Sequence, residues 1–249
     1  MTEASIRFSD VCKAYSGETV LSHFTLDIAT GEFLTIIGRS GCGKTTLLKM
    51  VNGLATPDSG RVIVDGRDVA GADPVALRRS IGYAIQNVGL FPHMTVEKNI
   101  AYVPSISGDG AWKGEAARER TAVLLELVGL DTALMERYPR SLSGGQRQRV
   151  GIARALAAGP GILLMDEPFG AVDEITREQL QDEILRIHRQ KRITILFVTH
   201  DIREALRLGT RTLVMEQGEA KQCAAPADIL RAPATPFVQR LISHASGII

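Results

Sequence analysis

Long apolar runs, cysteine and an excess of either charge are all scarce in this sequence of 249 residues. No apolar run approaches the roughly 20 residues that span a bilayer, and the N-terminus has no apolar core of a secretion signal, so we expect neither feature. Three widely separated cysteines, Cys12, Cys42 and Cys223, lack metal-ligand spacing and suit a reducing compartment. A formal net charge of +1 implies no overall attraction to nucleic acid. We therefore expect a cytosolic protein that binds no nucleic acid.

What the sequence does contain is a series of short apolar runs separated by amphipathic segments. The runs at 161–165 and 194–198 are continuous, as in strands buried on both faces of a parallel sheet. The first thirty residues alternate like antiparallel strands, whereas Pro104 and the breaks after it predict a loop over 104–114. We predict one α/β domain, 1–249, comprising a core at 1–86 and 161–218 with an N-terminal antiparallel β subdomain, an inserted helical subdomain at 87–160 and a helical tail at 219–249.

A glycine-rich segment, GRSGCGKTT at 38–46, stands between an apolar run and a segment with helical spacing. Strand, glycine-rich turn and a helix opened by Lys and Thr form the pattern of a phosphate-binding P-loop. Its glycines let backbone N–H groups point inward, Lys44 supplies a cation for the outer phosphates, and the Thr45 hydroxyl can ligate Mg²⁺. We interpret Cys42 as a small filler. The predicted nucleotide-binding residues are Gly38, Arg39, Ser40, Gly41, Cys42, Gly43, Lys44, Thr45 and Thr46.

Two adjacent carboxylates, Asp166 and Glu167, end the apolar run ILLM at 162–165. Neighbouring residues of a strand point to opposite faces, so the two acids can take separate roles at the strand end. We predict that Asp166 faces the Mg²⁺ held by Thr45 and that Glu167 faces the attacking water as a general base. The pair and the P-loop together indicate hydrolysis of a nucleoside triphosphate.

A second phosphate-binding site is predicted at the start of another helix. Ser143 stands at the cap position, and Gly144, Gly145 and Gln146 follow it, so backbone donors gather at a positive helix end. One chain thus presents two phosphate-type sites for one kind of triphosphate. A composite site between two copies of the chain explains this arrangement.

These motifs resemble, in order and spacing, those of the ATP-binding cassette (ABC) ATPases: GRSGCGKTT, Gln86, LSGGQ at 142–146, ILLMDE at 162–167 and His200. The resemblance covers nearly the whole chain and implies a RecA-like P-loop NTPase core. It also implies two chains that close head-to-tail, each ATP lying between one P-loop and the partner's LSGGQ.

The resemblance assigns roles that the residues alone do not. By itself Tyr15 reads as a half-buried packing residue, but the family implies that it stacks on adenine. The family likewise implies that Gln86 reaches the metal and the attacking water, that Asp173 lies at the dimer seam and that His200 holds the γ-phosphate. We interpret the arginines of the following helix as a solvated face: Arg147, Arg149 and Arg154.

A cassette without membrane spans resembles importer subunits, which lie at the cytoplasmic face of the membrane under a separate permease and depend on an extracytoplasmic binding protein. Within these, the segments 86–96 and 169–177, Val103-Pro104 and Trp112 resemble the osmoprotectant (glycine betaine, carnitine, choline) uptake ATPases. That group implies permease contacts by side chains after Gln86, with ordinary exposed packing as the alternative: Phe91, His93 and Met94.

Two departures from the osmoprotectant group stand out. Many of its members carry a C-terminal module of paired cystathionine-synthase-type domains, whereas this chain ends at Ile249, so we expect no such module. Val172 replaces the more common Leu, which removes one methylene.

Three other functions compete with osmolyte import: import of another small polar solute such as an amino acid or sulfonate, a non-transport cassette ATPase, and a P-loop kinase or passive nucleotide-binding module. The last two are disfavoured because the sequence has one cassette without a basic patch and carries both Glu167 and LSGGQ. The solute, the permease, the choice of homodimer or heterodimer and the regulation stay open.

Overall fold

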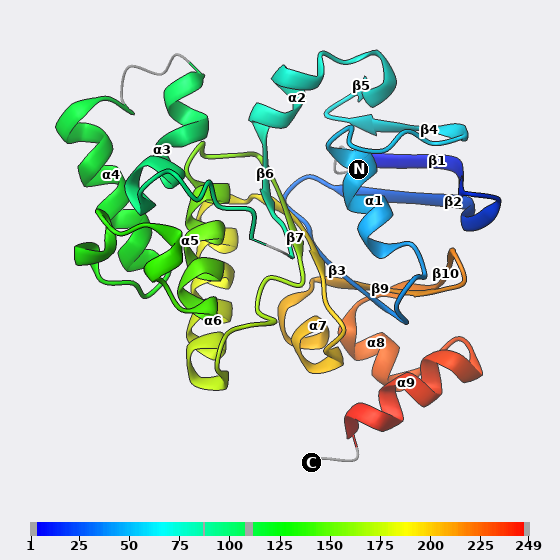
Figure 1. The fold of residues 1–249 in the computed structure, drawn as a ribbon. Helices are drawn as coiled ribbons and strands as arrows, with labels where there is room; N and C mark the ends of the chain where they lie inside the picture. The colour runs from blue at the N-terminus through cyan, green and yellow to red at the C-terminus, as the bar shows by residue number, and fades with distance from the viewer. Residues whose placement is uncertain (1–3, 87, 108–111, 247–249) are drawn as a thin grey trace. The chain divides into compact units, whose positions relative to one another are not determined.

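The computed structural model describes residues 4–86, 88–107 and 112–246 (Figure 1). The chain forms two compact units, one of residues 1–78 and 192–249 and one of residues 79–191. The predicted helical subdomain, 87–160, falls within the second unit. The predicted division into core, subdomain and tail stays a prediction.

The first unit contains an antiparallel sheet of strand order β2-β1-β4-β5. Its strands are β1 (Ala4–Tyr15), β2 (Glu18–Ala29), β4 (Ser59–Val64) and β5 (Arg67–Asp68). Ser16 and Gly17 connect β1 to β2 with φ values of 50° and 85°. Two consecutive positive φ values give the backbone twist that a two-residue hairpin needs. The antiparallel β subdomain expected at the N-terminus is thus present.

A second set of strands in this unit has the order β10-β9-β3-β8. They are β3 (Phe33–Gly38), β8 (Thr194–Val198), β9 (Arg211–Glu216) and β10 (Glu219–Ala224). β3 pairs in parallel with both β8 and β9. All five residues of β8 are buried, which explains why its sequence is apolar without alternation.

The start of the tail differs from the prediction, because residues 219–224 form β10 rather than a helix. A hairpin turn at Gln217 and Gly218, with φ values of 52° and 79°, folds this segment back onto β9. The helices of this unit are α1 (Lys44–Val51), α2 (Pro74–Ser80, which crosses the unit boundary), α7 (Ile202–Leu208), α8 (Pro226–Arg231) and α9 (Pro236–Ser246).

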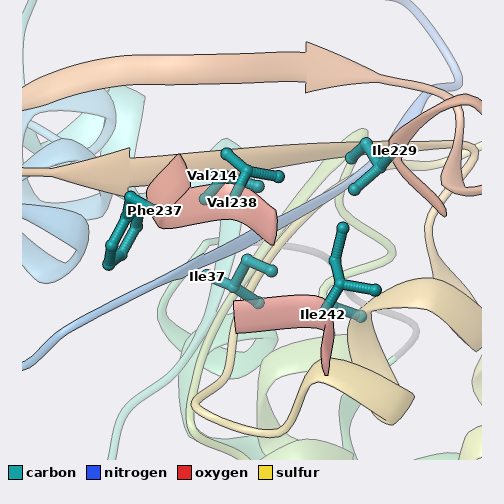
Figure 2. Packing of buried hydrophobic residues seen from close by; sticks show 7 residues of the cluster. Ile37, Val214, Ile229, Phe237, Val238 and Ile242 are labelled. Carbon is teal, nitrogen blue, oxygen red and sulfur yellow. The ribbon is translucent and has the colours of Figure 1, made fainter. Parts of the chain in front are cut away.

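Helix α9 packs on the strand that leads into the P-loop. Figure 2 shows Phe237, Val238 and Ile242 of α9 in one buried cluster with Ile37 of β3 and Val214 of β9. Burying apolar side chains stabilises a fold by about 25 cal/mol per Å² of area removed from water. The tail therefore supports the strand that ends at the P-loop.

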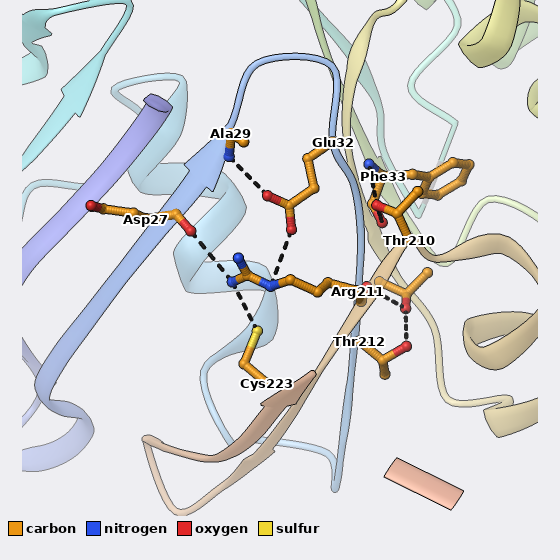
Figure 3. A network of polar contacts seen from close by, with 9 residues as sticks. Asp27, Ala29, Glu32, Phe33, Thr210, Arg211, Thr212 and Cys223 are labelled. Atoms are coloured by element: carbon orange, nitrogen blue, oxygen red, sulfur yellow. Dashed lines mark hydrogen bonds and ion pairs between the residues drawn. The ribbon is translucent and has the colours of Figure 1, made fainter. Parts of the chain in front are cut away.

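A polar network ties the two sheets of this unit together (Figure 3). Glu32 accepts a hydrogen bond from the backbone N–H of Ala29 at 2.8 Å and pairs with Arg211 Nε at 3.3 Å. Arg211 also donates to Cys223 Sγ at 3.1 Å and to the carbonyl of Asp27 at 3.4 Å. Burial raises the pKa of the Cys223 thiol. Cys223, on the strand paired with that of Arg211, thus serves as a partly buried acceptor in this network.

The second unit contains β6 (Ile81–Ala84) paired in parallel with β7 (Ile162–Asp166). Its helices are α3 (Val96–Ile106), α4 (Gly114–Leu127), α5 (Gly144–Leu156) and α6 (Glu174–Lys191). Helices α3, α4 and α5 pack on one another. Within 88–107 and 112–160 the described residues form helices and loops but no strand. None of the helices formed by the described residues combines the length and apolarity of a membrane span.

The loop predicted from residue 104 is wrong at its start, because Pro104 lies inside α3. The ring of Pro104 is buried, and this burial offsets the backbone hydrogen bond that a proline cannot make. The hydroxyls of Ser105 and Ser107 donate to the carbonyls of Tyr102 and Val103 and so continue the helical turn. Residues 108–111 of the predicted loop lie outside the described residues.

The segment before α3 is held by one side chain, that of Asn99, which is fully buried. Its Oδ1 accepts from the backbone N–H of Phe91 at 2.8 Å. Its Nδ2 donates to the carbonyls of Phe91, Met94 and Thr95 at 3.0 to 3.1 Å. Asn99 therefore fixes the conformation of residues 91–95, which include the predicted permease contacts.

We expect Asn99→Ala to lower the free energy of unfolding by about 2 to 4 kcal/mol, because several buried backbone groups lose their partner. Urea titration followed by circular dichroism measures the loss. Thr121→Val is the matched control. Thr121 is also fully buried, but its hydroxyl donates to the carbonyl of Ala117 in its own helix, at 2.8 Å, so this substitution should cost less than about 1 kcal/mol. Equal losses in the two variants would contradict the role given to Asn99.

Candidate nucleotide-binding and catalytic site

The P-loop connects β3 to α1, as the sequence predicts. Gly43 caps α1 with φ 99°, and Gly41 has φ 80°. A Cβ at position 43 would lie 2.8 Å from the carbonyl oxygen of Val20, whereas a Cβ at position 41 would have no atom of the described residues within 4 Å. Gly43 is thus required by its conformation and by close packing, while Gly41 borders open space.

Lys44 folds back over this loop. Its side chain is largely buried, and Nζ donates to the carbonyls of Gly38 at 2.8 Å and Arg39 at 2.9 Å. A cation held over a glycine-rich loop at a helix start, beside open space at Gly41, fits the phosphates of ATP. Thr45 follows as a hydroxyl ligand suited to Mg²⁺.

Cys42 lies buried within the loop, with Sγ 3.9 Å from Lys44 Nζ. Burial raises the pKa of this thiol, although the nearby Lys44 charge acts in the opposite direction. A neutral buried thiol is unreactive. These contacts agree with the interpretation of Cys42 as a small filler.

Tyr15 and His200 belong to the same unit as the P-loop. Tyr15 ends β1 and is 45% exposed, more than a packing residue would be, with Lys13 Nζ 5.2 Å from its ring centroid. Its ring can therefore be reached by a base, and adenine stacking stays a prediction.

His200 is exposed two residues past the end of β8, and hydrogen bonds hold the residues beside it. Thr199 Oγ1 donates to Glu204 Oε2 at 2.6 Å and accepts from the backbone N–H of Asp201 at 3.0 Å. Asp201 in turn caps α7 by accepting from two backbone N–H groups. Sequence reasoning missed Thr199 and Glu204, although Asp201 followed by Glu204 gave a recognisable helix-start signal.

The second unit brings Gln86 and Glu167 together. Gln86 Nε2 donates to Glu167 Oε2 at 3.0 Å. Asp166 is buried at the end of β7. The pKa of Tyr83 is raised, first by the burial of the tyrosine and second by the nearby charge of Asp166. These residues follow the carboxyl ends of two paired parallel strands, where the active sites of α/β proteins lie.

The prediction that the alternation of a strand sets the Asp166 and Glu167 side chains on opposite faces is wrong. Strand β7 ends at Asp166, so Glu167 does not continue the alternation of a strand. Glu167 instead has φ 47°, in the left-handed region that non-glycine residues rarely adopt. Because the backbone turns at Glu167, the pleat of a strand does not set the directions of the two carboxylates.

Ser143 caps α5 as predicted, but two of the five LSGGQ residues, Ser143 and Gln146, use their side chains for hydrogen bonds within the chain. Ser143 Oγ accepts from the backbone N–H of Gln146 at 3.1 Å, and Gln146 Oε1 accepts from that of Ser143 at 2.9 Å. This capping box orders the first turn of the helix, where backbone donors gather at the positive end of the dipole. A Cβ at Gly145 would lie 3.1 Å from the carbonyl oxygen of Ala171, so that position has little room for a side chain.

The arginines of α5 do not form a solvated face, which corrects the prediction. All three are partly buried and donate to backbone carbonyls. Arg147 bonds Leu142 at 2.6 Å, Arg149 bonds Gly129 at 2.7 Å, and Arg154 bonds both Val88 and Gly89 at 2.7 Å. The sequence pattern could not reveal this, because acceptors on other segments have no signature near the arginines.

Asp173 caps α6, a role that sequence reasoning missed. Its Oδ1 accepts from the backbone N–H of Thr176 at 3.0 Å, and hydrogen bonds from Thr176 hold the pKa of Asp173 below its usual value. Its side chain is exposed, so a place at a dimer seam stays a prediction. The predicted site residues thus fall into two groups. Tyr15, the P-loop and His200 lie in one unit, and Gln86, LSGGQ, Asp166, Glu167 and Asp173 lie in the other.

Known proteins identify the family. A model of the ABC transporter family matches residues 21–170. The chain belongs to the ABC transporter family. Among solved structures, a dimeric ATP-binding cassette in a post-hydrolysis state, bound to ADP and Pi, has a TM-score of 0.84 at 34% identity and covers 89% of this chain and 98% of its own. The predicted P-loop NTPase fold is confirmed.

Its relatives include transport proteins for osmoprotectants. A glycine betaine/carnitine/choline transport ATP-binding protein of Bacillus subtilis is 49% identical over 95% of this chain. A glycine betaine uptake system ATP-binding protein of Escherichia coli is 46% identical over 96% of this chain and 77% of its own length. The chain spans 62% of the length of the Bacillus relative. The predicted resemblance to the osmoprotectant group of this family is confirmed.

Proposed function

We propose that this chain is the ATP-hydrolysing subunit of an ABC importer and that the importer takes up a quaternary ammonium osmoprotectant. The observation that carries the proposal is the 3.0 Å hydrogen bond between Gln86 and Glu167, just past the carboxyl ends of β6 and β7. It places an amide beside a carboxylate that can accept a proton from water. The relatives named above support the substrate class.

In this proposal the chain's own residues divide the work of hydrolysis. Tyr15 stacks on adenine, the P-loop and Lys44 bind the phosphates, and Glu167 accepts the proton of the attacking water. Thr45, Gln86 and Asp166 would hold Mg²⁺, and the bound ion would supply positive charge to neutralise the phosphates. His200 contacts the γ-phosphate.

The second half of each site comes from another copy of the chain. Ser143 to Gln146 of one copy face the ATP bound to the P-loop of the other, with Asp173 at the seam, so that ATP closes a head-to-tail dimer. The exposed His93, with the half-buried Phe91 and Met94, contacts a separate permease at the cytoplasmic face of the membrane. An extracytoplasmic binding protein delivers the solute.

A pull-down tests the substrate class. The tagged chain is isolated from its native membranes in mild detergent, and the binding protein associated with its permease is then purified. We expect calorimetry to detect binding of glycine betaine, choline or carnitine by that protein, because quaternary ammonium ions bind in aromatic cages. Binding of an amino acid or sulfonate instead would keep the importer and reject the osmoprotectant. Recovery of no membrane partner would reject the importer.

A further inference from the structure

Two strained backbone positions lie at or next to the Gln86–Glu167 pair: Glu167 itself and Val88, two residues after Gln86. Val88 has φ 42° and Glu167 has φ 47°. A positive φ is uncommon for any residue with a side chain and is an outlier for a β-branched one such as Val88. Such conformations persist only where the surrounding structure holds them, and they gather at functional sites.

Side chains of a single helix, α5, hold both strained positions through their carbonyl groups. Arg154 donates from Nη2 to the carbonyl of Val88 and from Nη1 to that of Gly89, each at 2.7 Å. Gln148 Nε2 donates to the carbonyl of Glu167 at 3.1 Å, and its Oε1 accepts from the backbone N–H of Ala171 at 2.8 Å. Gln148 is only 5% exposed.

Helix α5 also packs closely against Val88 at a position between these two contacts. Gly151 lies midway between Gln148 and Arg154 in sequence, and a Cβ there would lie 2.8 Å from Val88 Cγ1. The guanidinium carbon of Arg154 also lies 6.0 Å from the ring centroid of Phe91, at cation–π distance. The helix therefore contacts the segment after Gln86 by packing as well as by hydrogen bonds.

We propose that Gln148 and Arg154 are positioning residues through which α5 holds Glu167 and Gln86 in the relative position that hydrolysis requires. The first turn of the same helix carries LSGGQ, which under the proposed function meets the ATP of the partner chain. A shift of α5 when that ATP binds moves the carbonyls of Val88 and Glu167 together, and so changes the Gln86–Glu167 contact. Helix α5 thereby couples one ATP site of the dimer to the other. This inference rests on the proposed function.

Arg154→Lys tests the coupling, because lysine keeps the charge but lacks the fork that reaches two carbonyls. We expect kcat for ATP hydrolysis to fall roughly 10- to 100-fold, since small misplacements of catalytic groups cost factors of this size. The affinity for a fluorescent ATP analogue should stay within about two-fold of the unmodified chain, since the P-loop that binds the phosphates belongs to the first unit and Arg154 to the second.

Hydrogen–deuterium exchange gives a readout that does not depend on catalysis: amides of residues 88–91 should exchange faster in Arg154→Lys. Arg149→Lys is the matched control. Arg149 lies on the same helix and also donates to a backbone carbonyl, that of Gly129, and lysine keeps the positive charge that acts on Asp173. The Arg149→Lys variant should leave kcat and the exchange of residues 88–91 unchanged.

A second variant, Gln148→Glu, keeps the acceptor for Ala171 and removes the donor to Glu167. It should lower kcat by a similar factor, and the double variant should lose less than the product of the two single losses, because both residues act on one contact. Unchanged kcat and exchange in Arg154→Lys, or equal losses in Arg149→Lys, would overturn the coupling. An unmodified chain that does not hydrolyse ATP would instead reject the proposed function, and the exchange measurement would still decide whether α5 holds the segment.

Discussion

Replacing Glu167 with Gln should lower kcat for ATP hydrolysis by at least about 100-fold, because a general base contributes factors of about 10² to 10⁴ and an amide cannot accept the proton. The change is nearly isosteric, and the amide oxygen can still accept the hydrogen bond that Gln86 donates at 3.0 Å. Binding of ATP should therefore persist. Two chains should stay closed around uncleaved ATP, because hydrolysis is what opens the proposed dimer.

Phosphate release measures the first effect, and gel filtration with and without ATP measures the second. Glu174→Gln supplies the control, since Glu174 is an exposed carboxylate in the first turn of α6. Its rate should stay within about two-fold of the unmodified chain, as is usual for surface substitutions. Hydrolysis by Glu167→Gln at the unmodified rate would show that another group accepts the proton.

Lys44→Ala should instead weaken ATP binding itself, on the order of 100-fold, because truncating one member of a close charge pair costs roughly 2 to 5 kcal/mol. Lys44 also donates to the carbonyls of Gly38 and Arg39, so its removal loosens the loop as well as deleting the cation. Equilibrium binding of a fluorescent ATP analogue measures the affinity.

Lys49→Ala is the control for the Lys44 variant. Lys49 lies on the same helix, α1, but its side chain is exposed. It should bind ATP as the unmodified chain does. The P-loop assignment fails if Lys44→Ala retains full affinity, and a general loss of folding is detected by the circular dichroism spectrum of each variant.

The features predicted well from the sequence are those whose cause is local. The P-loop was found because the glycines, Lys44 and Thr45 lie within nine consecutive residues of GRSGCGKTT, 38–46. Strands such as β8 were found because burial on both faces leaves a continuous apolar run. The cap at Ser143 was found because its partners follow within one helical turn.

The features that the sequence did not reveal depend on partners far along the chain. Strand β10 forms because a hairpin turn returns it to β9, which its own composition does not indicate. Pro104 stays helical because its ring is buried. Arg154 was misinterpreted because its acceptors, Val88 and Gly89, precede it by more than sixty residues.

The sequence by itself determined the family-specific motifs, the α/β class and the residue types available for binding and hydrolysis, because each rests on short-range spacing. Only the tertiary structure decided how these residues are held. It turned the backbone at Glu167 and Val88 into the left-handed region and secured both turns with Gln148 and Arg154. The physical reason is that neither strained residue favours its own conformation, so the long-range hydrogen bonds and packing of helix α5 must impose it.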